Sequence, residues 1–72
     1  MSARHSGRVS YIAPDGSFGE IAVPGMVDIA VDGAALRVAR ADALGVTVDF
    51  SFGVRADGTS GAVDVTTRGR LE

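Results

Sequence analysis

Hydrophobic and polar residues alternate along five short segments of the chain. The clearest alternation runs over residues 46–54, where the apolar positions share one face: Val46, Val48, Phe50, Phe52 and Val54. Successive side chains of a β-strand point to opposite sides, so a period of two residues is typical of strands. The same period recurs in four other segments. The pattern therefore predicts five strands, at residues 7–13, 17–23, 28–32, 46–54 and 61–67.

The alternation also predicts which side of each strand faces the interior. The residues expected to point inward are Val9, Ile21, Val23, Ile29, Val31, Val48, Phe50, Val63 and Val65. The residues expected to face outward are Phe18, Glu20, Ala30 and Asp32. Tyr11 is ambiguous, because simple alternation places it on the same side as Val9. It is exposed only if a β-bulge intervenes, and otherwise it belongs to the core.

Turn residues separate the strands, and one connection is longer than the rest. Turns are indicated at residues 14–16, 24–25, 32–33 and 57–58, each of which contains glycine. The alanine-rich segment 34–44 has room for a helical turn, with Leu36, Val38 and Leu44 expected to contact the barrel. Five strands with one long third-to-fourth connection predict an all-β, five-stranded antiparallel Greek-key barrel of the oligonucleotide-binding type (OB-fold).

Length and composition set the limits of this interpretation. A chain of 72 residues is enough for one domain, expected over residues 7–68, with a flexible N-terminus at 1–6 and a tail at 69–72. Leu71 and Glu72 are interpreted as the remnant of a purification tag. The chain has no cysteine, and all seven of its cations are arginine, which is consistent with a GC-rich bacterial genome. Without a signal peptide or an apolar segment of membrane-spanning length, a cytoplasmic protein is expected.

The sequence contains no pattern of catalytic or metal-binding residues. Asp28 and Asp32 lie four residues apart on one predicted strand, which separates them by about 13 Å, too far to share an ion. His5 and Ser6 are adjacent, but no third group is available to orient them for nucleophilic catalysis. We therefore expect a monomeric protein that is not an enzyme and has no cofactor and no metal.

Three stretches of the chain resemble the cold-shock domain family. Residues 7–11, 16–21 and 28–32 follow the spacing of the family patterns G-x-V-K-W-F, K-G-F-G-F-I and D-V-F-V-H-F-S-A-I, with Leu36 at the final aliphatic position. Further on, residues 44–50 and 61–65 resemble its L-x-x-G-x-x-V-x-F, in a shortened form, and its Q-A-A-N-V. The resemblance implies binding of single-stranded RNA or DNA on exposed aromatic residues of the first three strands, surrounded by lysines.

The positions that carry this function in the family match poorly. Tyr11 stands where the tryptophan is expected, and Phe18 keeps the first phenylalanine of the second pattern. The other platform positions are altered, to Ile12, Glu20, Ala30, Asp32 and Gly33, and the lysines correspond to Ser10 and Gly16. Nucleic-acid contacts are therefore expected from stacking on Tyr11 and Phe18, from Ser10, and from five arginines: Arg8, Arg37, Arg40, Arg55 and Arg68.

Two functional classes follow from this comparison. Each base that stacks on an aromatic side chain contributes about 1–3 kcal/mol, so the loss of three or four rings predicts weak binding, with a Kd of about 100 µM or weaker. The net charge of −2, together with Glu20 and Asp32, opposes the phosphates. The first interpretation is weak binding of single-stranded nucleic acid. The alternative is a protein-interaction or regulatory module on a barrel that has lost nucleic-acid binding.

Overall fold

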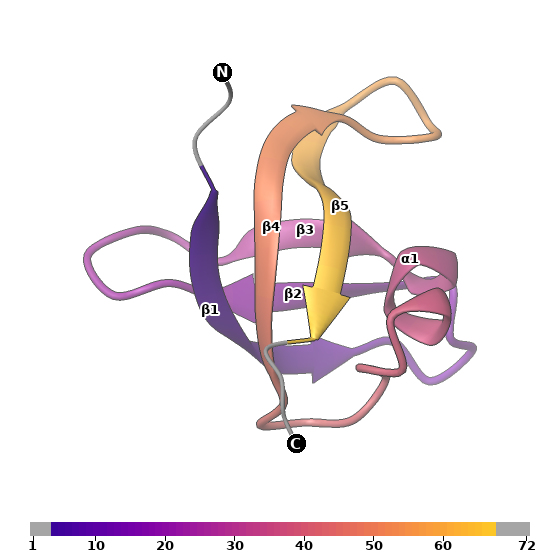
Figure 1. Ribbon diagram of the computed structural model, residues 1–72. Helices are drawn as coiled ribbons and strands as arrows, with labels where there is room; N and C mark the ends of the chain where they lie inside the picture. The colour runs from indigo at the N-terminus through magenta and orange to yellow at the C-terminus, as the bar shows by residue number, and fades with distance from the viewer. Residues whose placement is uncertain (1–3, 68–72) are drawn as a thin grey trace.

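The computed structural model describes residues 4–67 and shows a closed barrel of five strands (Figure 1). The strands are β1 (His5–Ile12), β2 (Phe18–Ala22), β3 (Ile29–Asp32), β4 (Thr47–Val54) and β5 (Ser60–Thr67). All five predicted strands are confirmed, with ends that shift by at most two residues. His5 and Ser6 belong to β1 and not to a flexible N-terminus. Arg68 and the predicted tail at 69–72 lie outside the described residues.

The order of the strands around the barrel is β1-β2-β3-β5-β4, and β4 closes the barrel by pairing with β1. Four of the neighbouring pairs are antiparallel, but β3 and β5 run parallel, joined at Val31 and Ala62. The prediction of an entirely antiparallel barrel is therefore wrong at this pair. Alternation has the same period in both arrangements, whereas direction depends on the crossover connection, which here contains a helix and β4.

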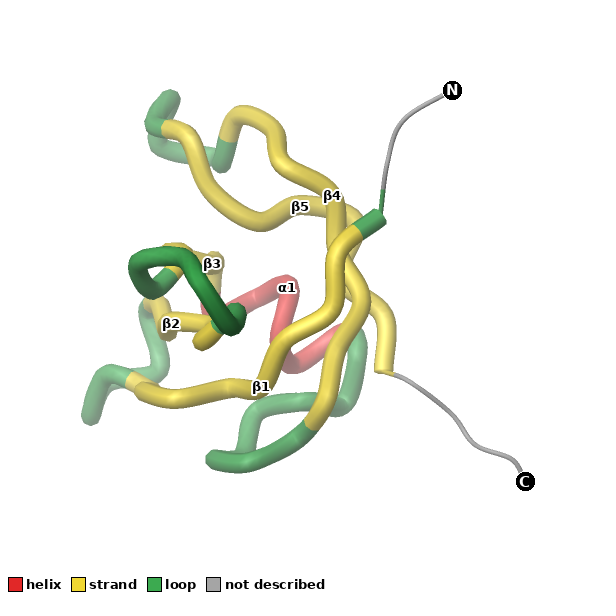
Figure 2. Tube along the Cα trace, turned by 90° about the vertical axis from the view of Figure 1, so that its left-hand side faces the viewer, coloured by secondary structure: helices red, strands yellow, loops and turns green. Residues whose placement is uncertain are grey.

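The helix α1 (Gly33–Val38) closes one end of the barrel, opposite the β2–β3 loop (Figures 1 and 2). Its Leu36 is completely buried, as predicted. Val38 and Leu44 are 85% and 68% exposed, so the predicted contacts of these two residues with the barrel are wrong. Residues two apart on a helix lie on nearly opposite sides, so Leu36 and Val38 cannot both face the barrel. No helix within residues 4–67 is long and apolar enough to cross a membrane.

The core follows the predicted alternation with one exception. The predicted inward residues that are buried are Val9, Ile21, Val31, Val48, Phe50 and Val65, and two more, Val23 and Ile29, are partly buried against them. Val63 is the exception, because Ala62 takes the inward position instead. Two residues of β5, Asp64 and Val65, stand opposite the single residue Phe50, and Asp64 has a φ of 53°. This β-bulge reverses which side chains of β5 face inward.

The hairpin of β4 and β5 extends beyond the barrel (Figures 1 and 2). Phe52 and Val54 share the inward side of β4 with Phe50, yet they are 44% and 71% exposed. His5 covers part of Phe52, with ring centroids 4.5 Å apart, and also lies beside Phe50. The apolar face of β4 is therefore longer than the barrel that it fills.

We predict that α1 depends on the burial of Leu36. A helix of six residues is too short to be stable by itself in water, so it must be held by packing against the barrel. Leu36→Ala should lower the free energy of unfolding by about 2–5 kcal/mol. Val38→Ala, which shortens an exposed side chain of the same helix, should change it by less than about 0.5 kcal/mol. Urea denaturation measures the free energy of unfolding of the two variants. If both substitutions lowered it equally, the burial of Leu36 would not be what holds α1 on the barrel.

Candidate nucleic-acid interface

Two aromatic rings lie next to each other on the outside of the barrel. Tyr11 and Phe18 are 42% and 38% exposed, and their ring centroids are 5.8 Å apart. Tyr11 reaches the surface because β1 contains a bulge. Val9 pairs with Ile21 and Tyr11 pairs with Glu20, which leaves Ser10 as an extra residue in β1. Of the two alternatives for Tyr11, the exposed position is therefore the one observed.

The strand register places the remaining platform positions around these rings. Glu20 lies opposite Tyr11 on one side and Ala30 on the other, and Phe18 lies opposite Asp32. We call these five residues, Tyr11, Phe18, Glu20, Ala30 and Asp32, the outer face. Glu20 and Asp32 are only half-exposed.

The altered platform position Ile12 does not lie on this face, and the predicted contact Ser10 lies in the bulge beside it. Ile12 pairs with the buried Gly19 and packs against the core, so it points to the opposite side of β1 from Tyr11. Ser10 is exposed within the bulge, and its hydroxyl donates hydrogen bonds to the backbone oxygen of Glu20 at 3.3 Å and to Oδ2 of Asp28 at 3.2 Å. Ser10 therefore connects the bulge to the β2–β3 loop.

The loops β1–β2 and β4–β5 are built from the same turn. Asp15 accepts hydrogen bonds from the backbone N–H and the hydroxyl of Ser17, at 3.0 and 2.7 Å. Asp57 accepts the equivalent bonds from Thr59, at 3.0 and 2.6 Å. These hydroxyl bonds are the main cause that lowers the pKa of each aspartate below its usual value of 3.8. Both turns are therefore held by ionised carboxylates at neutral pH, and they lose this support as the pH falls below the usual value.

Arg55, one of the predicted phosphate contacts, forms an ion pair with Asp32. Its Nη1 lies 3.2 Å from Oδ1 of Asp32, and its Nη2 bonds to Asp57 at 3.3 Å and to Thr59 at 2.7 Å. The backbone N–H of Ala56 donates to Oδ2 of Asp32 at 3.1 Å. The Arg55 side chain is only 13% exposed. Asp32 therefore fixes the β4–β5 loop to β3, and the charge that was expected to repel nucleic acid is compensated.

Gly61 makes room for this ion pair. A Cβ atom at position 61 would lie 2.5 Å from the backbone oxygen of Ala30 and 2.6 Å from Cδ of Arg55. Any larger residue would therefore separate β5 from β3 and displace the arginine. The fixed loop leaves a pocket of about 460 Å³ beside the outer face, lined by Ser17, Phe18, Ala30, Asp32, Arg55, Ala56 and Asp57.

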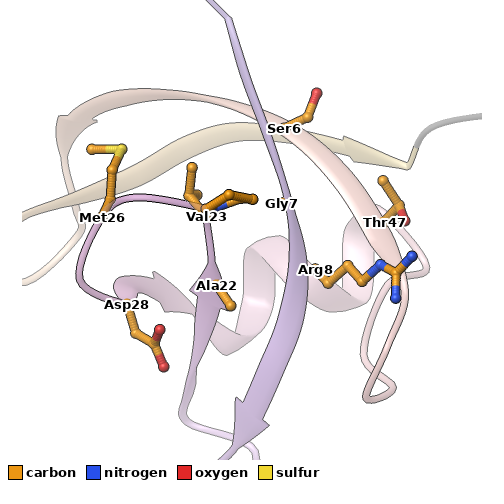
Figure 3. A pocket seen from close by; sticks show the side chains of 9 residues that line it. Ser6, Gly7, Arg8, Ala22, Val23, Met26, Asp28 and Thr47 are labelled. Atoms are coloured by element: carbon orange, nitrogen blue, oxygen red, sulfur yellow. The ribbon is translucent and has the colours of Figure 1, made fainter.

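A second pocket, of about 640 Å³, lies between β1 and the β2–β3 loop (Figure 3). Its wall is mainly apolar and includes Ala22, Val23 and Met26. Arg8 lines it from β1, and Asp28 lines it from the loop. The Arg8 guanidinium has no hydrogen bond or ion pair with any residue of 4–67. Nothing in the sequence identified Val23 or Met26 as wall residues, because Pro24-Gly25 indicates only a turn.

The other predicted arginines lie elsewhere. Arg37, on α1, donates a hydrogen bond of 2.7 Å to the backbone oxygen of Gly16 and so holds the β1–β2 loop. Arg40 lies in the turn after α1 with a φ of 57° and lines neither pocket. Of the predicted arginines within the described residues, Arg8 alone opens onto a pocket with its guanidinium unpaired.

Comparisons with known proteins add no further constraint on this surface. No protein-family model matches the chain, and searches of the curated proteins and of the solved structures found no match. Within residues 4–67, no group of three or more histidine, cysteine, aspartate or glutamate side chains is arranged to hold a metal ion. The inference about function therefore rests on the geometry described above.

We predict that Asp32 and Asp57 contribute unequally to holding Arg55. Their distances to Arg55 are nearly the same, but the Asp32 side chain is 30% exposed and the Asp57 side chain is 56% exposed. Solvent weakens the more exposed pair, so double-mutant cycles with Arg55 should give a coupling of about 1–3 kcal/mol for Asp32 and a smaller coupling for Asp57. The cycles use Asn in place of Asp and Gln in place of Arg, with unfolding followed in urea. A larger coupling for Asp57 would show that the loop is not fixed through β3.

Proposed function

We propose that this protein is a cold-shock-like barrel of the OB type that binds single-stranded nucleic acid weakly on its outer face. The observation that carries the proposal is the exposed pair Tyr11 and Phe18, brought together by the bulge at Ser10. In OB-folds, oligonucleotides bind on the face of strands 2 and 3 and to the loops that join strands 1–2 and 4–5. Here Phe18 lies on β2 opposite β3, Tyr11 adjoins it from β1, and the loops β1–β2 and β4–β5 line the pocket beside Phe18. The strand order β1-β2-β3-β5-β4 is consistent with this assignment.

Stacking on the two rings sets the scale of the affinity. Every base presents a flat π-face, so an exposed Tyr or Phe accepts any base at about 1–3 kcal/mol. Two such contacts and few free cations correspond to a Kd of about 100 µM or weaker. Binding of this kind shows little sequence preference, because ring faces do not distinguish one base from another.

Electrostatic repulsion is the second contribution to the affinity, and it comes mainly from Glu20. Asp32 is neutralised by Arg55, whereas the Glu20 carboxylate forms no ion pair within residues 4–67. Glu20 lies directly opposite Tyr11, so a phosphate that follows a stacked base passes close to it. Glu20 is thus the uncompensated charge of the outer face, and it weakens binding without preventing it.

We predict that the two rings are required for binding. Tyr11→Ala and Phe18→Ala should each weaken binding of an oligothymidylate by about fivefold or more, because each removes one stacking contact. Phe52→Ala is the matched control, since Phe52 is similarly exposed, at 44%, but lies on β4 with its ring beside His5 and Phe50. The measurement is a fluorescence-anisotropy titration of each folded variant. If the folded parent binds no RNA or DNA oligomer, the protein-interaction alternative replaces this proposal.

We predict that Glu20 limits the affinity. Glu20→Gln should tighten binding about fivefold at low salt, which corresponds to the removal of about 1 kcal/mol of repulsion. Asp42→Asn removes one negative charge from the exposed loop after α1 and serves as the control for net charge, with an expected change of less than twofold. Repeating the titrations at higher salt should reduce the gain, because exposed charges are screened. Equal gains in both variants would mean that only net charge matters and that Glu20 does not face the ligand.

A further inference from the structure

The pocket beside Arg8 continues the outer face. On β2, Ala22 is the next outward residue after Glu20, and Arg8 lies directly opposite it on β1. The hydrogen bond from Ser10 to Asp28 connects the bulge that exposes Tyr11 to the loop that forms the far wall of the pocket. A chain that lies over the two rings therefore meets this pocket at the end of the outer face nearest the β2–β3 loop.

We propose that this pocket binds one further nucleotide of the same strand, with a phosphate on Arg8 and the base against the apolar wall. This inference rests on the proposed function and extends it by a subsite that the two rings do not provide. The volume of about 640 Å³ falls within the range of small-ligand sites, which combine an apolar lining with a few polar groups. The thioether of Met26 and the methyl groups of Val23 provide the apolar surface for a base.

The charges of the pocket set the orientation of this nucleotide. Arg8 and Asp28 both line the pocket and lie on opposite sides of β1 in this view, with the Arg8 side chain extending toward Thr47 (Figure 3). Arg8 carries a guanidinium that is unpaired within residues 4–67 and can bond two phosphate oxygens, whereas the Asp28 carboxylate repels a phosphate. The phosphate is therefore placed on the Arg8 side, and the base lies toward Met26 in the β2–β3 loop.

The length of the ligand separates this subsite from the rings. A thymidylate dimer has one base for each of Tyr11 and Phe18, whereas a hexamer also reaches the pocket. Arg8→Gln should weaken binding of the hexamer about three- to tenfold and of the dimer less than twofold. It should also reduce the salt slope of the hexamer by about 0.7, the value for one phosphate contact to a single strand. Arg40→Gln removes the same charge from the turn after α1 and should alter neither affinity by more than twofold.

A direct readout of occupancy completes the test. The methyl signals of Met26 and Val23 in the NMR spectrum should shift with the hexamer and remain in place with the dimer. Thymidine monophosphate alone should leave both signals unchanged, and a shift at a similar concentration would overturn the proposal in favour of a site for free nucleotides. Equal losses of affinity in Arg8→Gln and Arg40→Gln, or a hexamer that binds Arg8→Gln as tightly as the parent, would also overturn it.

The two proposals fail in distinguishable ways. If the parent binds neither oligomer, the proposed function is wrong, and the subsite proposal fails with it because it requires a bound oligonucleotide. If the parent binds both oligomers and the loss of Tyr11 weakens both, while Arg8→Gln changes neither, only the subsite is wrong.

Discussion

The inside of a five-stranded barrel must be filled from one face of each strand, and this constraint governs the rest of the molecule. The interior is small, so each strand contributes only two or three side chains to it, such as Val48 and Phe50 of β4. Alternation then determines whether each other strand residue faces the interior or the solvent, unless a β-bulge inserts an extra residue into the strand. Two bulges do so here. One in β5 brings Ala62 and Val65 inward, and one at Ser10 turns Tyr11 outward while Val9 stays in the core.

The bulge at Ser10 thereby determines the character of the outer surface. Without it, Phe18 would be the one ring on the outer face, because Tyr11 would point inward with Val9. With it, two rings stand side by side at 5.8 Å, opposite a carboxylate that has no partner within residues 4–67. A stacking surface and a repulsive charge therefore share one small patch. In the proposed function, this combination accounts for a low affinity.

The ion pair of Asp32 and Arg55 organises the end of this surface near Phe18. Asp32 occupies the residue before α1, where an aspartate often caps the helix, but its side chain makes no such cap. It bonds instead to Arg55 and to the backbone of Ala56. One carboxylate thus positions the β4–β5 loop and removes its own charge from the outer face. The two pockets lie at opposite ends of that face, and among the residues 4–67 that line them, the one cation without an ion pair is Arg8.

The sequence by itself determined the five strands and most of the core, because alternation of hydrophobicity is a local property that survives in any barrel. It also placed Phe18, Glu20, Ala30 and Asp32 on one outward side, a placement that the register confirms. Tertiary structure decided what depends on partners distant in the chain. The parallel pairing of β3 with β5 follows from the crossover through α1. The exposure of Tyr11 follows from the extra residue that β1 has opposite β2. The ion pair between Arg55 and Asp32, which lie 23 residues apart, follows from the folding of the β4–β5 loop onto β3. Alternation carries no information about pairing direction, bulges or long-range ion pairs, because each is set by the energy of contacts between segments.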